Sequence, residues 1–493
     1  MILIASISDI NWVNLYRIAY QNELVELGPE LLAEVDKSRQ HFLKLIAEGT
    51  PCYGVTTGLG KLVNTELNAD AKAALPANML HARAAAVGEP FPPAVGRAMM
   101  LIRLVNFLSG RSGVSTDLCQ ALVTRLNQGL TPWVPGLGHG MAADATANTH
   151  AFQTLIGEGF VYGADGQREP ASLAMAERGL APISLADREG LALINGICAA
   201  PAFAMDAFYQ LEKLLALANM VGAVSLEAMA APKDSIDPAL GHLSSEGGVA
   251  RTINVLRRHL NHSQTEVYKL QAAVSYRIIP QVHGAFDDAL IQLRQRIENL
   301  LVDCTDNPIM DGDNLLSVGS FHNQHLVNQV EQVALALAHV GSLSERRLHR
   351  MMSSDNTGLN AQLAARPGLD AGLVVAHKAC IDLSARLRVL AQPVSLFTGD
   401  TSAGQEDYMS MAIPAIHRLY EMRSLTEMLL AYELLAGLVA LRQRDSVPGD
   451  DVSGVCDYFD RLVPPLLKDR SPGPDVETIL KHFNEPGFRS LFG

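Results

Sequence analysis

The stretch "NQVEQVALALAHVGSLSERRL", residues 328–348, decides the fold class. Its apolar and small residues recur at three- and four-residue steps, the spacing that places side chains on one face of an α-helix. The residues on that face are Val330, Ala334, Leu337 and Gly341. Because small residues belong to the face, we expect this helix to pack closely against its neighbours.

The pattern of long helices extends over residues 201–445. A second stretch, "MLLAYELLAGLVAL" at 428–441, is apolar nearly all round, which suits a helix that is surrounded by others. Strand-like alternation of apolar and polar residues is scarce. We therefore predict a mostly α protein with a large central helical bundle and a smaller, loop-rich N-terminal region.

Three regions follow from the distribution of loops and breakers. Residues 1–200 alternate helical stretches with glycine- and threonine-rich loops, including a loop at 140–144. Residues 201–445 form the predicted bundle. Residues 446–493 carry six prolines and predict short helices and turns.

Composition narrows the class of protein. Hydrophobic residues make up 48% of the 493 and charged residues 18%, enough apolar material for a large core. The net charge of −13 argues against nucleic acid as a partner. The six cysteines are dispersed, the start of the chain lacks a secretory signal pattern, and the longest apolar run, Met428 to Leu441, is shorter than the ~20 residues of a membrane span. These features predict a cytoplasmic protein that has no membrane partner.

Four segments gather polar residues of possible chemical use: "CYGVTTGLG" (52–60), "EGLALING" (189–196), "SYRIIPQVHGA" (275–285) and "TSAGQEDYMSM" (401–411). Taken singly, each has an ordinary structural explanation: a hydrogen-bonded tyrosine, a capping asparagine, a surface arginine and a solvated acidic turn.

Taken together, in this order and at these separations, the segments resemble the histidine and aromatic amino-acid ammonia-lyases and their aminomutase relatives. The resemblance runs from roughly residue 10 to 450. Further collinear pieces are "AAAVGEP", "LIGEG", "SLEA", "PQVHGA", "TDNP" and "ERR". The tripeptide Gln405-Glu406-Asp407 makes the chain look closer to the bacterial histidase branch than to plant phenylalanine ammonia-lyases.

The resemblance implies a mostly helical homotetramer in which several subunits supply loops to each active site. Tyr53 matches the tyrosine thought to act as base, and Asn195 matches the asparagine that holds the electrophile or the substrate amine. Arg277 matches the arginine that pairs with the substrate carboxylate, a role suited to its planar fork. Glu406 matches the glutamate that faces the amine or side chain. The other positions assigned to substrate binding are Gln405 and Phe321, the latter in the family's "NFH" region.

The family's electrophile is a methylidene-imidazolone made from an internal Ala-Ser-Gly. Counting back from Asp144 and His150, this sequence has Met141-Ala142-Ala143 instead. Ala142 has no hydroxyl to eliminate, and Ala143 adds a methyl group, on the carbon next to the ring-closing nitrogen, where that nitrogen would have to attack. We therefore predict that the chain carries no such prosthetic group and no other cofactor.

Other departures surround the same site. The family's "SHAAGVG" reads "ARAAAVG" here and places Arg83 where histidases have histidine. His377 and Arg386 stand where a glutamine and an acidic residue are usual, and Val274 stands at a position that is commonly tyrosine. Arg83 would favour the phenolate form of Tyr53, and with Arg277 it could stabilise an enolate or hold carboxylates.

Three functional hypotheses remain open. The first is a lyase that works without the imidazolone on a small, carboxylate-bearing and possibly amino-acid-like substrate. The second is a non-catalytic homologue that binds a ligand or joins an active paralogue as partner subunit. The third is an engineered inactive histidase, which would explain Ala142 but neither Met141 nor Ala143.

Two pairs of histidines are candidates for metal ligation. His322 and His325, and likewise His259 and His262, are three residues apart, a spacing that can hold zinc when a third ligand arrives from elsewhere. No carboxylate or cysteine stands beside either pair at ligand spacing. We predict no metal site.

Overall fold

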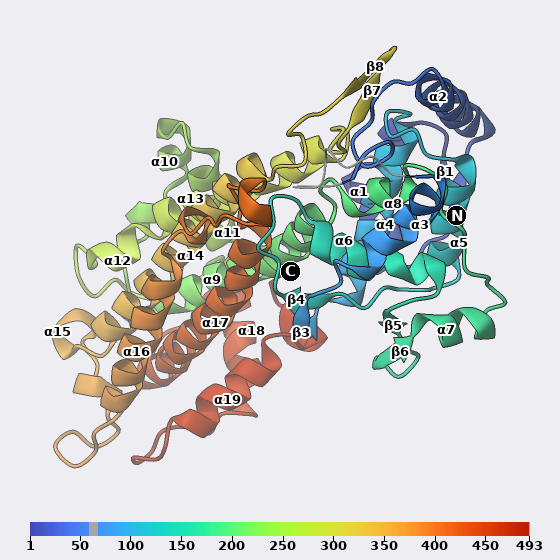
Figure 1. The fold of residues 1–493 in the computed structure, drawn as a ribbon. Coiled ribbons are helices and arrows are strands. Elements are labelled where there is room, and N and C mark those ends of the chain that lie inside the picture. Colours follow the sequence, from blue (N-terminus) through green and yellow to red (C-terminus); the bar gives the residue numbers. More distant parts are fainter. Residues whose placement is uncertain (59–67, 493) are drawn as a thin grey trace. The chain divides into compact units, whose positions relative to one another are not determined.

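The structure, a computed structural model, describes residues 1–58 and 68–492. The last two residues of the quoted "CYGVTTGLG" motif, 59 and 60, lie outside the described residues. Helices dominate and the strands are short, so the predicted mostly α class with a helical bundle is confirmed (Figure 1). The chain divides into two compact units. Unit 1 comprises residues 1–207, 294–330 and 393–417, and unit 2 comprises residues 208–293, 331–392 and 418–493.

Unit 1 contains the shorter helices of the N-terminal part and the strand pairs. Its helices are α1 (Trp12–Tyr20), α2 (Pro29–Ala47), α3 (Ala69–His81), α4 (Pro93–Leu108), α5 (Thr116–Asn127), α6 (Ala145–Phe152), α7 (Ala171–Glu177) and α8 (Glu189–Ile194). Its strands form two-stranded pairs. One pair is parallel: β1 (Ile2–Ile4) with β2 (Val25–Leu27). Three pairs are antiparallel: β3 (Val87–Pro90) with β4 (Pro135–Leu137), β5 (Phe160–Tyr162) with β6 (Arg168–Pro170), and β7 (Ile309–Asp311) with β8 (Asn314–Leu316).

Close backbone contact positions the helices of unit 1. Gly190 of α8 lies against Pro76 of α3, where an added Cβ would be only 2.4 Å from the proline Cα. Helix α4 is buried along nearly its whole length and forms the centre of this unit.

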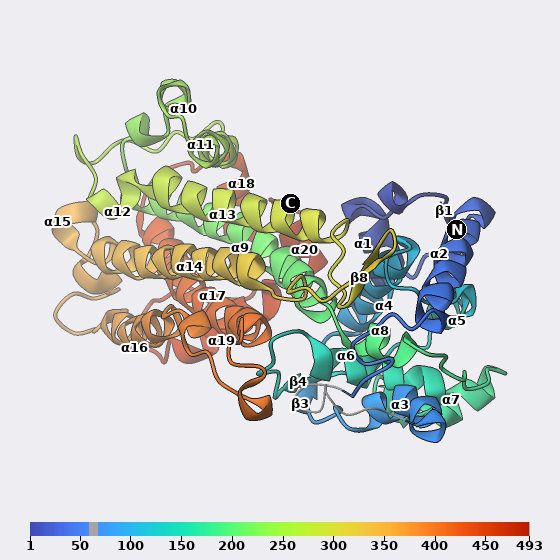
Figure 2. The same ribbon diagram turned by 45° about the horizontal axis from the view of Figure 1, so that its top comes forward.

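Unit 2 is built around long helices. The greater part of four helices belongs to it: α9 (Ala199–Met229), α13 (Ile279–Leu300), α14 (Gln324–Met351) and α17 (Ala412–Gln443). The others are α10 (Pro238–Leu243), α11 (Gly247–His259), α12 (Val274–Arg277), α15 (Ser354–Thr357), α16 (Val374–Leu390), α18 (Asp450–Asp460), α19 (Gly473–His482) and α20 (Pro486–Arg489). Figure 2 shows α9, α14, α16 and α17 lying side by side.

Small residues allow these helices to approach closely, as the sequence predicts. A Cβ on Gly341 of α14 would meet Leu387 of α16 at 2.3 Å and Leu429 of α17 at 3.1 Å. Glu433, the only charge within the apolar stretch 428–441, is fully buried and forms an ion pair with Arg347, with Nη2 to Oε2 at 2.9 Å. A buried charge is tolerated because it is paired in this way.

Two helical stretches are long and apolar enough to cross a membrane by length and composition: Glu189–Met229 and Ala412–Gln443. In their most apolar windows, 94% and 72% of the residues are buried inside the protein. Such burial is typical of the core helices of a bundle.

Candidate active site

The loop between β4 and α6 contains the three residues that replace Ala-Ser-Gly. Ala142 is buried, with 8% of its surface exposed, and Met141 and Ala143 are half-buried. Thr146 Oγ1 donates to Met141 Sδ at 2.7 Å. None of the three side chains carries a hydroxyl that could leave as water. The residues present therefore do not fit the formation of a methylidene-imidazolone.

Asp144 anchors this loop from its C-terminal side. Its buried carboxylate accepts from Ala200 N at 2.8 Å and from Asn323 Nδ2 at 2.9 Å. Ala200 lies in the first turn of α9, where backbone N–H groups have no partner within the helix. Burial raises the pKa of Asp144 to about 6, while the hydrogen bonds from Ala200, Asn323 and the neighbouring backbone act against that rise. The loop is thus held at its C-terminal side by the hydrogen bonds of a buried carboxyl group.

His150, on the helix that follows, fixes the "ARAAAVG" segment. Its Nε2 accepts from Ala86 N at 3.1 Å. Burial, and secondarily the nearby His139, lowers the pKa of His150 to about 4. The ring is therefore neutral at pH 7, as an acceptor nitrogen requires.

Tyr53, Arg83 and Glu406 come from three separate segments and lie within electrostatic range of one another. Burial lowers the pKa of Arg83, and the neighbouring Tyr53 and Glu406 oppose that shift. Arg83, just beyond the C-terminus of α3, donates from Nη1 to Met79 O at 3.1 Å. Glu406 accepts from Ser402 Oγ at 3.0 Å. A phenol, a guanidinium and a carboxylate thus share one site, which suits proton transfer next to developing charge.

Asn195 ends α8 in an extended conformation and is held on both sides of its amide. Its Nδ2 donates to Asn307 O at 2.6 Å, and its Oδ1 accepts from Gly196 N at 2.9 Å. Its backbone carbonyl accepts from the buried Arg103. These contacts fix the orientation of the amide.

Two asparagines that sequence reasoning did not single out connect these pieces. Asn148 of α6 donates to the carbonyls of Ile194 and Gly196, at 3.1 and 3.2 Å, and so ties the helix after the loop to the turn at Asn195. Asn323 contacts Asp144, which brings the segment containing Phe321 to the same loop. Only the position of Asn323 two residues after Phe321 could have suggested its role.

The other predicted substrate-binding residues are divided between the two units. Phe321 is half-buried and Gln405 is exposed. The segments that contain them meet where the rings of His322 and Tyr408 lie 5.9 Å apart. Arg277 ends α12 in unit 2, and its buried Nε has no hydrogen-bond partner among the described residues. The structure thus brings Tyr53, Arg83 and Glu406 together within unit 1, whereas Arg277 belongs to the other unit.

Comparison with known proteins gives the family. The model of the aromatic amino acid lyases matches residues 10–459. The chain belongs to the aromatic amino acid lyase family. It is 34% identical to a histidine ammonia-lyase of Geobacillus thermodenitrificans over 472 residues, covering 94% of this chain and 93% of that relative. It is 30% identical to a histidine ammonia-lyase of Bacillus subtilis over 484 residues, with 96% and 94% covered.

Solved structures of the lyase family agree with the fold. Ergothionase from Treponema denticola, an ergothioneine-degrading enzyme in complex with desmethyl-ergothioneine sulfonic acid, superposes with a TM-score of 0.94 at 23% identity, covering 100% of this chain and 99% of that one. Histidine ammonia-lyase from Trypanosoma cruzi gives a TM-score of 0.84 at 26% identity, with 97% and 92% covered. The predicted membership of the histidase-like lyase family, and with it a lyase activity class, is confirmed.

Proposed function

We propose that this lyase-family protein eliminates an amine from a small, carboxylate-bearing, amino-acid-like substrate without a methylidene-imidazolone. The observation that carries the proposal is Met141-Ala142-Ala143, three residues without a hydroxyl, in a loop that Asp144 anchors. The neighbouring Tyr53, Arg83 and Glu406 form an acid–base and charge-stabilising group. A site without the electrophile that keeps these residues suits a substrate whose leaving group departs without being activated by the enzyme.

A quaternary α-ammonium group is the leaving group that best meets this condition. Trimethylammonium departs as neutral trimethylamine and cannot lose a proton from nitrogen, so it needs no electrophile to become a leaving group. Ergothioneine, which one structural neighbour degrades, is a trimethylated betaine of a 2-thiohistidine. We therefore extend the proposal to α-trimethylammonium betaines of histidine-like amino acids.

The roles follow from charge and position. Tyr53 would take the β-proton, and Arg83 beside it would stabilise the negative charge that develops. Glu406 would face the cationic ammonium. Arg277 would pair with the substrate carboxylate through its planar guanidinium. Asn195, Gln405 and Phe321 would bind the rest of the substrate.

The intact mass tests the first half of the proposal. Closure of the imidazolone removes two waters, about 36 Da, and we expect the unmodified mass of the chain. A two-water deficit would contradict our interpretation of the loop.

A substrate screen tests the second half. Purified protein is offered ergothioneine, histidine betaine and histidine, and formation of the conjugated acrylate product is followed by its ultraviolet absorbance. We expect turnover of a betaine and none of histidine. Tyr53→Phe should lower kcat by roughly 10²–10⁴, the usual contribution of a general base. Tyr268→Phe, at a half-exposed tyrosine of unit 2, serves as the matched control.

A second candidate function is a catalytically inactive homologue that binds a ligand or joins a partner subunit. The observation in its favour is that both polar atoms of the Asn195 amide already have a protein partner, Nδ2 in Asn307 O and Oδ1 in Gly196 N. Ligand-dependent protection of the fold without turnover of any betaine would favour this candidate over the lyase.

We also propose that the protein is a cytoplasmic homotetramer. Its resemblance to histidases and the dispersed, free cysteines support this assignment.

A further inference from the structure

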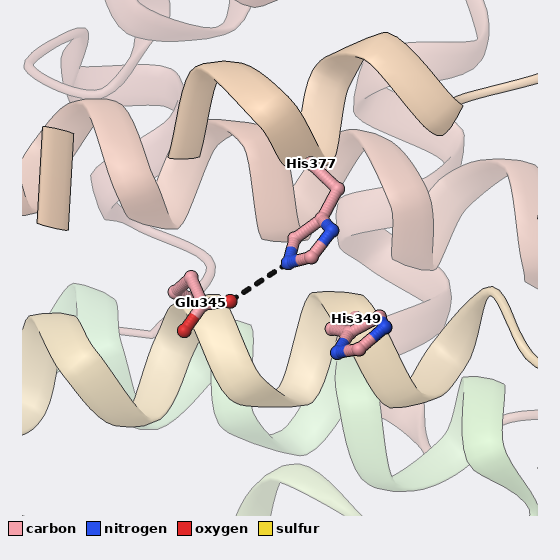
Figure 3. Close-up of side chains that lie close together, drawn as sticks. All are labelled: Glu345, His349 and His377. Carbon is pink, nitrogen blue, oxygen red and sulfur yellow. Dashed lines mark hydrogen bonds and ion pairs between the residues drawn. The ribbon is translucent and has the colours of Figure 1, made fainter. Parts of the chain in front are cut away.

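Three potential ligands meet in unit 2, at residues to which the proposed reaction assigns no role. Glu345 and His349 lie one turn apart on α14, and His377 comes from α16 (Figure 3). One donor atom from each lies within 4.8 Å of the others. We propose that these three side chains form a binding site for a divalent transition-metal ion, best suited to zinc.

Two of the three donor atoms lie near the spacing of ligands on one zinc ion. His377 Nε2 lies 2.7 Å from Glu345 Oε1. Ligand atoms on one tetrahedral zinc lie roughly 3.3 Å apart, given metal–ligand distances of about 2.0–2.2 Å. If these two atoms move apart by a few tenths of an ångström, a zinc ion therefore fits between them. Two imidazoles and one carboxylate, with a fourth position open to water, is a donor set that zinc accepts.

His349 offers a donor atom that no other described residue engages. Its Nδ1 is buried and has no hydrogen-bond partner among the described residues. The rings of His349 and His377 are stacked, 4.3 Å apart and nearly parallel, so one ring must turn before both can direct a nitrogen lone pair at one ion.

The site has an accessible side and a displaceable counter-ion. Glu345 is fully buried, whereas His377 keeps 18% of its side chain exposed and His349 is half-buried. Arg346 Nε forms an ion pair with Glu345 Oε2 at 3.3 Å, and its side chain is 54% exposed. An entering cation can replace the guanidinium, which then turns into solvent.

A substitution of His377 can remove metal binding while it preserves helix packing. Glutamine, the residue usual at this position in the lyases that the chain resembles, can still donate a hydrogen bond to Glu345. His377→Gln therefore keeps the contact between α14 and α16 while removing a ligand of the class that zinc prefers. His349→Gln removes the second nitrogen ligand. His339→Gln, at an exposed histidine of the same helix, is the matched control.

The test uses the full-length protein, freed of metal with a chelator and titrated with zinc chloride against a chromophoric competitor. We expect one zinc per chain in the wild type and in His339→Gln, and at least tenfold weaker binding in His377→Gln and in His349→Gln. Zinc should raise the Tm of the wild type but not of His377→Gln, because an ion that binds only the folded state stabilises it. The metal-free Tm of His377→Gln should stay near that of the wild type.

Two results would overturn the proposal. One is a wild type that takes up no zinc, and the other is a His377→Gln protein that binds zinc as tightly as the wild type. Visible absorption of bound cobalt(II) gives an independent readout, since tetrahedral coordination should appear in the wild type and be lost in both ligand variants.

Discussion

At the scale of single residues, His150 carries a pH dependence that can be worked out in sign. The unfolded chain binds a proton on this histidine near its ordinary pKa of 6.5, whereas the folded state binds it only near 4, because burial and then His139 disfavour the charged ring. The contribution of His150 to stability is therefore fully present above pH 6.5. It is lost as the pH falls through about 4, by roughly 3 kcal/mol in total.

His150→Gln tests this prediction. Glutamine can still accept from Ala86 N but does not titrate, so we expect the stability difference between wild type and variant to change between pH 6.5 and 4. Chemical denaturation at each pH measures it. The exposed His242→Gln should leave the pH dependence unchanged, and parallel curves for wild type and His150→Gln would refute the assignment.

Arg83 yields a second prediction at this scale. Because its guanidinium lies beside Tyr53 and Glu406, Arg83→Gln should lower kcat/KM for a betaine substrate by roughly 10²–10³, mainly through kcat. Arg83→Lys keeps the charge but not the planar fork and should retain part of the activity. Steady-state kinetics decide the matter, and equal loss in both variants would mean that the charge itself is unimportant.

Residue patterns predicted some members of the site but not the contacts that hold them together. Tyr53, Arg83 and Glu406 could be named because their motifs resemble a family, although nothing local in the sequence shows that they meet. The anchoring of Asp144 by Asn323 could not be predicted, because 179 residues separate the two. Spacing along the sequence could suggest as metal ligands only histidines three residues apart. His259 and His262 instead bond to Asp451 and Asp450, and the Glu345 cluster draws on two different helices.

At the scale of elements, α11 and α13 touch through glycine. A Cβ on Gly248 would lie 2.0 Å from Gly284 O, a backbone atom that cannot move aside cheaply. Gly248→Ala should therefore destabilise the protein by about 3 kcal/mol in spite of the better helix propensity of alanine.

The neighbouring glycine supplies the control. A Cβ on Gly247 would meet only the flexible end of Arg251, so Gly247→Ala should be neutral or slightly stabilising. Calorimetric Tm values compare the two variants. Equal Tm values would show that the helices have room to separate at this crossing.

Helical periodicity predicted the buried face of a helix better than it predicted which other helices that helix would contact. All four residues of the α14 face, Val330, Ala334, Leu337 and Gly341, are buried as expected. The sequence could not predict that Arg347 on the same helix would pair with Glu433, because the crossing of α14 and α17 depends on the packing of the whole bundle.

At the scale of the whole molecule, the resemblance to histidases predicts a tetramer whose active sites draw residues from several chains. Light scattering should give the mass of four chains. Co-expression of Tyr53→Phe with Arg277→Met should yield mixed tetramers that recover part of the wild-type turnover, although each variant alone is inactive. No recovery in mixed tetramers would mean that each site is built from one chain.

The loop that ends at Asp144 has a consequence for how the protein becomes active after synthesis. A lyase that depends on Ala-Ser-Gly must first cyclise its own backbone and expel two waters, so folding precedes competence by a slow maturation step. Under the proposed function this chain needs no such step, because hydrogen bonds from Ala200 and Asn323 to Asp144 anchor the loop. Activity should therefore appear in step with folding, without a lag, and small nucleophiles that poison an exposed methylene should find nothing in this loop to attack.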